Sequence, residues 1–461
     1  MMLSVRRPYW IALCLAATLS GLGPTALVPS AALGAPDVNR SMVDYSFARA
    51  SLEFYKQTGD QVLLDGAVAG LRAAVRQHGG DPEKIPALHQ APSADLDLAS
   101  LNRDLALANK QFGATVGEKE LTYAAIKGVM ESLHDRWTVF LDPKEYKSLN
   151  EGLDGGNFPG VGVVIDVDPM TKALLVVQTI DGGPAQKAGI QPGDVVLTID
   201  GKTTKGLTTA DDSKMIRGPA GTSVQLTVQR PGTPGPLSFT ITRATIHTPS
   251  IFARVLNGNV GYVRVVVFGL TTGQELSQAL DRLDKAGVKG YILDLRNNGG
   301  GYLNAAIDVS SKFVPEGPIV SIDSRTKPLT TFDAENSAIA PRPLAVLVNE
   351  YTASASEITS GAIQDSHAGV LIGTKTFGKG VVQTIFPLPD GSAIKITTAR
   401  YLTPSGRDIN TVGIEPNIVV ADTKPADMGN VALDSQLKRA LSYVGGQIGN
   451  PVAAPAANGH R

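Results

Sequence analysis

Three residues in the last quarter of the chain have the types and spacing of a hydrolytic site. Ser354 and Lys379 are 25 positions apart, and Gln383 follows the lysine by four. A serine hydroxyl becomes a nucleophile when a neighbouring base takes its proton, and a neutral lysine can be that base. We therefore expect Ser354, Lys379 and Gln383 to meet in one site that hydrolyses a peptide bond.

Ser354 lies where an expected strand (344–349) gives way to an expected helix (354–365). The free N–H groups and the dipole of a first helical turn favour negative charge, which suits a nucleophile whose intermediate carries an oxyanion. The residues from Ser354 to Glu357 also follow the pattern Ser-x-x-Glu, which is typical of a capping box. On local sequence alone, the cap is the favoured interpretation.

Lys379 lies in an expected glycine-rich turn before an expected strand (381–386). As a base it must be neutral, so its pKa must fall from about 10.4 toward about 7, and burial away from acids can achieve this. No Asp or Glu occurs at positions 368–387. Gln383 lies an even number of residues further along, where a neutral amide can orient the lysine without stabilising its charge.

Two competing interpretations fit this segment less well. Residues 373–379 match the start of a phosphate-binding loop, but Gly380 replaces the Ser or Thr that holds magnesium, and a strand follows instead of a helix. A histidine triad would need His367, which lies 13 residues after Ser354 on the same helix, or about 20 Å away. We interpret His367 as a helix C-terminal cation. The sequence has no HExxH pattern, so neither a metal nor another cofactor is expected.

An Asn-Asn-Gly-Gly-Gly turn at 297–301 is a second chemical feature. Successive glycine N–H groups can point at a ligand without obstruction, so the turn could form an oxyanion hole. It could equally be an ordinary loop between a strand and a helix. The residues alone leave both interpretations open.

These features need an α/β scaffold, and the surrounding pattern predicts one. From residue 251 onward, strand patterns (260–265, 290–296 and 344–349) alternate with helical patterns (271–285 and 354–365). Such alternation is typical of helices packed on a sheet.

The segment 158–246 consists of short alternating strands and resembles a PDZ domain. The resemblance is carried by GPAQKAGIQPGDVVLTIDG at 183–201 and by IRGPAGT at 216–222. A PDZ domain binds a peptide C-terminus as an added strand. The matching carboxylate-binding loop contributes Gly160, Val161, Gly162 and Val163. A PDZ-like fold used only as a spacer is the alternative.

The N-terminal region from 38 to 147 has a helical pattern. Two similar pieces, 61–71 and 120–130, place apolar residues at helical spacing around glycines that permit close packing. We interpret them as two helices of one small bundle without a catalytic role. Oligomerisation through this region is compatible with the pattern.

A leader precedes these helices. A basic start, an apolar run at 9–19 and small residues up to Gly34 indicate a signal peptide. An uncleaved anchor is the alternative, but glycines from Gly21 onward interrupt the run before the roughly 20 residues that a spanning helix needs. The only cysteine, Cys14, lies in this leader, so cysteine nucleophiles and thiolate metal sites are excluded from the mature chain. The net charge of −1 gives no global attraction to nucleic acid.

Taken together, the motifs resemble those of the carboxyl-terminal processing proteases, also called tail-specific proteases. The matching stretches are DLRNNGGG, NEYTASASEITSGAIQD, GTKTFGKGVVQ, DGSAIKITTARYLTPSGR and GIEPNI, with DRWTVFLDPKEY before the PDZ segment. The resemblance runs from about 121 to 420.

This resemblance implies a serine peptidase with a Ser/Lys dyad assisted by Gln. Its nucleophile falls on Ser354, its base on Lys379 and the partner that orients the base on Gln383. The oxyanion donors fall on the backbone N–H groups of Gly300 and Ala355.

Other matching positions have lesser roles. Asp365 is expected to be structural, and Arg217 is a candidate for linking the PDZ domain to the site. Gly299 replaces the family's usual proline, and Asn417 replaces a common aspartate. Neither departure touches the dyad.

The expected organisation is a signal peptide (1–34), an N-terminal helical region (35–152), a PDZ domain (153–247), a crotonase-like α/β Ser/Lys protease core (248–424), and a C-terminal helix with a disordered tail (425–461). The expected function is an exported serine endopeptidase that cleaves proteins near their C-terminus, in the bacterial periplasm, the thylakoid lumen or outside the cell. Its partners would be proteins or peptides with accessible C-termini, without nucleic acid. A homo-oligomer or an adaptor protein is compatible with this organisation.

Two alternatives come from other functional classes. One is a PDZ-bearing binding or chaperone protein with an inactive core, which the intact Ser/Lys/Gln set disfavours. The other is a crotonase-like acyl-CoA enzyme, which shares the α/β core but gives no reason for a PDZ domain.

Overall fold

The computed structural model describes residues 14–15, 38–153, 158–167, 173–180, 182–424 and 427–448. Most of the predicted signal peptide and the tail from 451 lie outside these ranges. The chain forms two compact units, Met1–Leu153 with Ser250–Arg461, and Asp154–Pro249. The N-terminal helices therefore belong to the same unit as the α/β core.

The smaller unit has the PDZ-like architecture that the sequence predicts. Its main sheet has the order β4 (Val163–Val167), β5 (Leu174–Thr179), β6 (Val195–Ile199), β8 (Ser223–Gln229) and β9 (Leu237–Thr242), with β7 (Lys202–Thr203) beside β6. A separate pair joins β3 (Phe158–Gly160) to β10 (Ala244–Ile246), and the helices are α6 (Pro184–Ala188) and α7 (Thr209–Ile216). In this sheet β4 is an edge strand, and α7 packs beside it.

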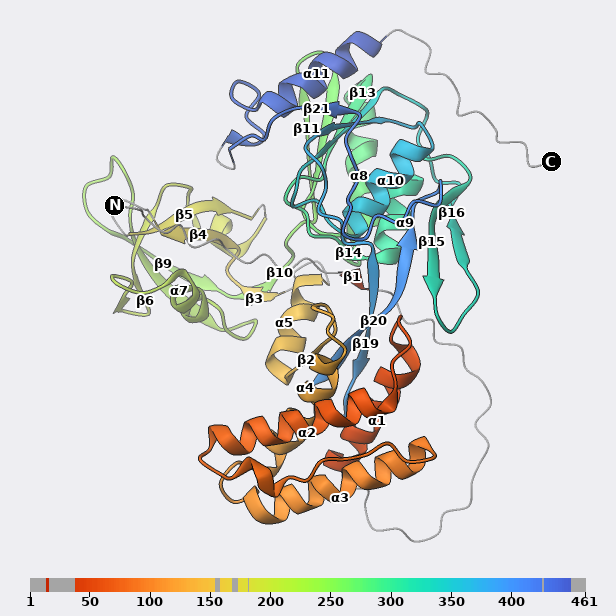
Figure 1. The fold of residues 1–461 in the computed structure, drawn as a ribbon. Coiled ribbons are helices and arrows are strands. Elements are labelled where there is room, and N and C mark those ends of the chain that lie inside the picture. Colours follow the sequence, from red (N-terminus) through yellow and green to blue (C-terminus); the bar gives the residue numbers. More distant parts are fainter. Residues whose placement is uncertain are drawn as a thin grey trace, which may run out of the picture. The chain divides into compact units, whose positions relative to one another are not determined.

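In the larger unit, the N-terminal region forms a helical bundle (Figure 1). Its elements are α1 (Val38–Glu53), α2 (Asp60–Gln77), the short 3-10 helix η1 (Pro82–Lys84), α3 (Ala94–Phe112) and α4 (Glu118–Ser132). Helices α2 and α4 cross at glycines: a Cβ on Gly128 would lie 2.0 Å from the Gly66 carbonyl oxygen, and one on Gly70 would lie 2.0 Å from that of Ala124. The predicted close packing around these glycines is confirmed.

The α/β core is a six-stranded sheet whose middle strands are parallel. Its order is β11 (Ile251–Leu256), β12 (Val260–Val265), β13 (Gly290–Asp294), β17 (Leu344–Val348), β18 (Val370–Gly373) and β21 (Ile418–Val419). Only β11 runs antiparallel to its neighbour. The helices are α8 (Thr272–Lys285), α9 (Leu303–Ser311), α10 (Ala355–Asp365) and α11 (Ser435–Gln447).

Alternate residues of these strands face opposite sides of the sheet. Leu293 and Val346 join the core formed with α8, α9 and α10, whereas Ile292 and Leu347 join the core formed with α11. The sheet is thus covered on both faces, which explains why its strands are almost continuously apolar.

A second sheet connects this core to the helical bundle. Its order is β14 (Gly301–Tyr302), β1 (Cys14–Leu15), β19 (Val381–Pro387), β20 (Ala393–Leu402), β15 (Pro318–Ser324) and β16 (Thr330–Asp333), and β2 (Val139–Leu141) pairs with β20 ahead of α5 (Pro143–Leu153). The far end of the β19–β20 hairpin carries Leu388, Ile394 and Ile396 into the core of the bundle. Figure 1 shows this hairpin running from the α/β core to the helices.

The predicted combination of helical region, PDZ domain and α/β core is confirmed. No helix in the described ranges has both the length and the apolar character needed to cross a membrane.

Candidate active site

Three neighbouring parallel strands deliver the candidate site residues to one edge of the sheet. β13 leads into the glycine turn at 297–301, β17 into the loop that ends at Ser354, and β18 into the loop that carries Lys379. The carboxyl ends of parallel strands meet at the same edge, where ligands usually bind in open α/β sheets. The topology therefore explains why residues far apart in sequence share one region.

Side-chain amides and backbone groups fasten the first two of these loops together. Asn349 donates from Nδ2 to Asn297 Oδ1 at 2.9 Å, and its own Oδ1 accepts the Asn297 N–H at 3.0 Å. The Ala353 N–H donates to the Asn298 carbonyl oxygen, also at 3.0 Å. The loop before the serine is thus held against the glycine turn.

Ser354 has a strained backbone. Its φ is 67° and its ψ is −120°, in a region that residues with a Cβ rarely adopt. Such a conformation costs about 1–3 kcal/mol and persists where the surroundings enforce it, which is common at functional sites. The residue is fully buried and immediately precedes α10, so the predicted strand–turn–helix context is confirmed. The strain itself was not predicted.

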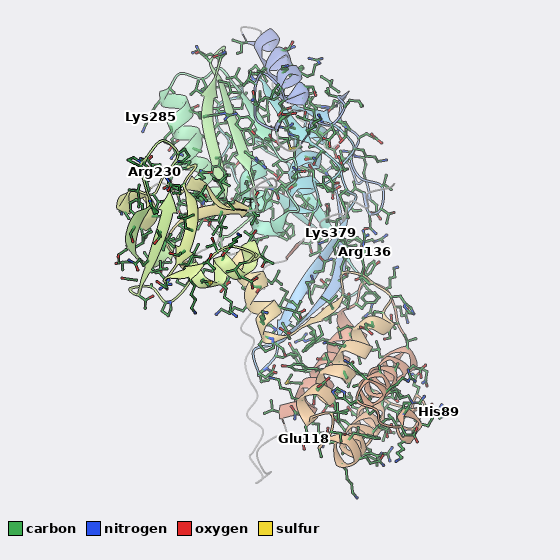
Figure 2. All side chains as sticks on the ribbon, turned by 90° about the vertical axis from the view of Figure 1, so that its left-hand side faces the viewer. His89, Glu118, Arg136, Arg230, Lys285 and Lys379 are labelled. Carbon is green, nitrogen blue, oxygen red and sulfur yellow. The ribbon has the colours of Figure 1, made fainter. Side chains whose placement is uncertain are left out.

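Lys379 is also fully buried, and its Nζ lies 4.2 Å from the centre of the Trp137 ring. The guanidinium carbon of Arg136 lies 4.5 Å from the centre of the same ring, and Figure 2 labels both Arg136 and Lys379. The flanking glycine is required by close packing, because a Cβ on Gly380 would lie 2.5 Å from the Asn410 nitrogen. Strand β19 begins at Val381 and no helix follows the lysine, contrary to a phosphate-binding loop.

A buried carboxylate joins the backbones of the serine and the lysine. Glu357 is fully buried, and its Oε2 accepts the N–H of Ser354 at 2.8 Å and that of Lys379 at 2.9 Å. Its Oε1 accepts the Gly378 N–H at 2.7 Å and the Thr376 hydroxyl at 2.6 Å.

Burial raises the pKa of Glu357, and these four hydrogen bonds oppose that rise. The sequence predicted Glu357 only as a helix-capping residue. Its bond to the Ser354 N–H is present, but its contacts with the lysine loop were not foreseen.

Gln383 occupies an irregular point of β19. The pairing of β19 with β20 shifts between Val382 and Gln383, so that Gln383 lies opposite Thr397. Bulges of this kind re-aim a side chain and are common beside active sites. The Gln383 side chain is fully buried, and its Nε2 donates to Thr397 Oγ1 at 3.3 Å. Its Oε1 has no hydrogen-bond partner within the described part of the chain.

The two candidate oxyanion donors differ in their surroundings. Ala355 is buried at the first position of α10. The Gly300 N–H donates to Asn298 Oδ1 at 2.8 Å, and Asn298 is itself held by a 2.8 Å bond from its Nδ2 to the Val265 carbonyl. In this conformation the Gly300 N–H is directed at a buried side chain, so it could bind an oxyanion only after the turn rearranges.

The remaining sequence-derived residues lie outside this cluster. Asp365 accepts the Ser405 N–H at 3.0 Å, and its pKa is lowered because hydrogen bonds and the charge of Arg407 outweigh the effect of burial. Asn417 Oδ1 accepts the Leu371 N–H at 2.9 Å, a backbone-fastening role. His367 is exposed beyond the far end of α10.

The PDZ residues lie at the start of the edge strand. Gly160 ends β3, Val161 is buried, Gly162 has a φ of 77°, and Val163 begins β4. Arg217 is exposed at the C-terminal cap of α7.

Among the side chains that the structure describes, no group of three or more His, Cys, Asp or Glu is arranged to hold a metal ion.

The chain resembles known proteins over most of its length. Residues 259–420 match the model of peptidase family S41, and residues 175–230 match that of the PDZ domain. A carboxyl-terminal-processing protease of Synechocystis is 39% identical over 334 residues, which covers 70% of this chain and 78% of the relative. The carboxy-terminal processing protease CtpA of Bacillus subtilis is 35% identical, covering 77% and 78%. A solved structure of an S41 protease from Bacteroides fragilis has a TM-score of 0.50 at 16% identity, covers 90% of this chain and 99% of that chain, and is similar in fold.

Proposed function

Because the chain belongs to peptidase family S41 as a carboxyl-terminal processing protease, we propose that it cleaves protein substrates near their C-terminus with Ser354 as nucleophile and Lys379 as base. The observation that carries this proposal is the Glu357 carboxylate, which accepts one backbone N–H from each of these residues. A shared rigid partner holds nucleophile and base in one fixed relation, as general-base activation requires.

In the proposed reaction, Ser354 Oγ bonds to the scissile carbonyl carbon while the Lys379 amine takes the hydroxyl proton. The tetrahedral intermediate then breaks its C–N bond, and the leaving amine takes the proton from Lys379. Water attacks the resulting ester, gives its proton to Lys379, and the Ser354 oxygen leaves with that proton. The amine is regenerated at the end of the cycle.

Negative charge on the intermediate would develop at the N-terminus of α10. The Ala355 N–H and the dipole of that helix favour an anion there. Gly300 would contribute once its N–H leaves Asn298, so we expect the glycine turn to change conformation when substrate binds.

Substrate would enter as an extended strand. The short strand β1 pairs in parallel with β14 at Gly301 and with β19 at Gln383. This pairing supports the proposal that an extended substrate chain can bind between β14 and β19. In the smaller unit, the edge strand β4 with α7 beside it suits capture of a peptide C-terminus by strand addition. The donors would come from the segment Gly160, Val161, Gly162 and Val163.

We further propose that the protein is exported after removal of the segment 1–34, to a periplasm, a thylakoid lumen or the cell exterior. The basic and apolar pattern of that segment supports this. A gating role for Arg217, a homo-oligomer and an adaptor protein are compatible with the same function.

The test uses an unfolded protein, such as β-casein, as substrate and mass spectrometry of the fragments. Lys379→Ala and Ser354→Ala are each expected to abolish cleavage, while binding of a peptide with a free C-terminus is retained. Cleavage by either variant at the wild-type rate would overturn the dyad. An inactive wild type that still binds the peptide would favour the alternative of a PDZ-bearing binding protein.

A further inference from the structure

The residues just after α4 extend from the helical bundle into the candidate active site. Trp137 lies against Lys379, and Asp135 and Thr138 lie against Thr397, the partner of Gln383. The segment 135–138 thus touches the surroundings of both the proposed base and its orienting glutamine. No catalytic role was predicted for the helical region.

Asp135, Thr397 and Gln383 form a directed chain of hydrogen bonds. Thr397 Oγ1 donates to Asp135 Oδ2 at 2.5 Å, and Gln383 Nε2 donates to Thr397 Oγ1 at 3.3 Å. Thr138 closes the arrangement, since its hydroxyl donates to the same Asp135 oxygen at 2.7 Å and accepts the Thr397 N–H at 3.0 Å. Thr397 and Gln383 are fully buried and Thr138 is 3% exposed, whereas Asp135 is half-buried, so the bond between Gln383 and Thr397 is the one shielded from water.

Each step of this chain is fixed by the number of protons available. A carboxylate oxygen can only accept, so the single proton of the Thr397 hydroxyl is committed to Asp135. That hydroxyl can then only accept from Gln383, which must present its NH₂ group. The amide oxygen Oε1 is consequently turned the other way, and it has no partner among the described residues.

A buried acceptor without a donor is costly, and in a native structure it requires an explanation. The proposed base is four residues away in sequence, and its neutral amine carries two N–H donors and one lone pair. An amide oxygen can accept one of those N–H groups. An amide N–H in the same place would instead bind the lone pair and compete with the Ser354 hydroxyl.

We propose that Asp135 and Thr397 are positioning residues that fix the amide of Gln383 with its oxygen toward Lys379, so that the amine lone pair stays available to Ser354. This role rests on the proposed Ser354/Lys379 function. It gives the helical bundle a direct part in catalysis, because Asp135 follows α4 and is 262 positions from Thr397 in sequence.

The test compares three variants of the full chain in cleavage of β-casein and of an internally quenched peptide. Thr397→Val removes the hydroxyl at nearly constant shape and is expected to lower kcat at least tenfold with little change in KM. Thr397→Ser restores the hydroxyl and is expected to recover most of that loss. Thr398→Val is the matched control: within the described part of the chain, the Thr398 hydroxyl bonds only to that of Thr384 across the same two strands, at 2.9 Å, so the variant should behave as wild type.

A second measurement needs no turnover. The chain has two tryptophans, Trp10 in the leader and Trp137, so in a Trp10→Phe background the fluorescence reports Trp137 alone. Its ring lies 4.2 Å from Lys379 Nζ, so loss of the ammonium proton should change the emission, and Lys379→Met should remove that change. The other charged groups around this region, Asp135, Arg136, Glu357 and Lys395, are the same in the wild type and in both Thr397 variants.

In Thr397→Val the Gln383 amide is free to rotate, so its N–H group can take the place of its oxygen beside Lys379. An N–H group there disfavours the ammonium form of the lysine. We expect the fluorescence midpoint and the acid limb of the kcat/KM profile of Thr397→Val to move together to lower pH, by about half a unit or more. Should Thr397→Val not fold, Asp135→Ala is expected to give the same two shifts, because it frees the Thr397 proton.

The outcomes separate the two claims. The proposed positioning role of Asp135 and Thr397 would be overturned by a wild-type kcat with an unmoved fluorescence midpoint in Thr397→Val. Equal losses of kcat in Thr397→Val and Thr397→Ser would overturn it too. Wild-type cleavage by Ser354→Ala in the same assay would instead overturn the proposed dyad. An inactive Ser354→Ala with a fully active Thr397→Val would agree with the Ser354/Lys379 dyad and refute only the positioning role of Asp135 and Thr397.

Discussion

Arg296 offers a test of how the glycine turn is anchored. It lies two residues after the end of β13 and is 1% exposed. All five of its side-chain N–H donors are used: two bind Asp294, at 2.9 and 2.6 Å, two bind Asp434, at 3.0 and 2.8 Å, and one binds Gln436, at 2.9 Å. Arg296→Met keeps an unbranched apolar chain and removes every one of these bonds.

The expected loss of stability in Arg296→Met follows from the two carboxylates that remain. The variant leaves two buried carboxylates, Asp294 and Asp434, without their cation, and removing one member of a buried ion pair costs about 3–5 kcal/mol. That is a large part of the 5–15 kcal/mol by which a typical domain is stable. Because the turn at 297–301 follows directly, cleavage activity should fall with stability.

The pH dependence gives a second, independent signature. Burial tends to raise the pKa of Asp434, but its bonds with Arg296 and the backbone outweigh this, so its pKa is lowered in the wild type. A lowered pKa adds stability above the ordinary pKa near 4, and that stability is lost as the pH falls. Without the arginine, burial alone raises the pKa, and the sign reverses. The difference in free energy of unfolding between Arg296→Met and the wild type should therefore be largest at pH 7 and should decrease toward pH 4.

Urea unfolding at both pH values measures these quantities, and the matched control is Arg400→Met. Arg400 also bridges two carboxylates, Asp323 at 3.0 Å and Asp408 at 3.1 Å, but its side chain is 45% exposed. Its loss should change the free energy of unfolding by about 1 kcal/mol or less. The double variant Arg296→Met/Asp434→Asn should recover part of the loss. A change below about 1 kcal/mol for Arg296→Met, or a gap that is the same at both pH values, would refute the reasoning.

Two further predictions concern the rest of the larger unit. Gly128→Ala places a methyl group 2.0 Å from the Gly66 carbonyl oxygen and should lower the free energy of unfolding by about 3 kcal/mol, measured by urea unfolding; an unchanged midpoint would contradict the close crossing of α2 and α4. Burial and the neighbouring Glu335 raise the pKa of Asp308 to about 6, so stability present below pH 4 is lost as the pH rises through 6. Asp308→Asn should remove this dependence and, after allowance for solvent screening, gain about 1 kcal/mol at pH 8 and nothing at pH 4. Thermal unfolding of the wild type and of Asp308→Asn at a series of pH values measures this difference. Parallel curves of melting temperature against pH for the two proteins would argue against the Asp308–Glu335 pair.

Local patterns predicted the scaffold well. The buried runs of β13 and β17 appear as strands in the expected places, and the helix after Ser354 begins one residue later than predicted. Apolar periodicity and turn residues act over a few neighbours, so the sequence carries this information directly. The serine, lysine and glutamine could be selected because each stands at such a local boundary.

What could not be predicted depends on long-range contacts. Glu357 looked like a capping residue because only its bond to Ser354 is local, while its bonds to Gly378 and Lys379 span more than twenty positions. Asp135 begins the matching stretch DRWTVFLDPKEY, but nothing local indicated its role, since its partner Thr397 is 262 positions away. The occupied N–H of Gly300 arises from a side-chain rotamer, which no pattern of residue types specifies.

The hairpin β19–β20 explains why the helical bundle and the α/β core form one compact unit. One end of the hairpin carries Gln383 opposite Thr397, and the other carries Leu388 and Ile394 into the bundle core. Asp135 follows α4 and accepts a hydrogen bond from Thr397, so a displacement of α4 would act on Gln383 through Thr397. Destabilising substitutions in the bundle should therefore lower turnover while the α/β core remains folded. Substitutions at Arg296 should lower turnover and the stability of the α/β core together.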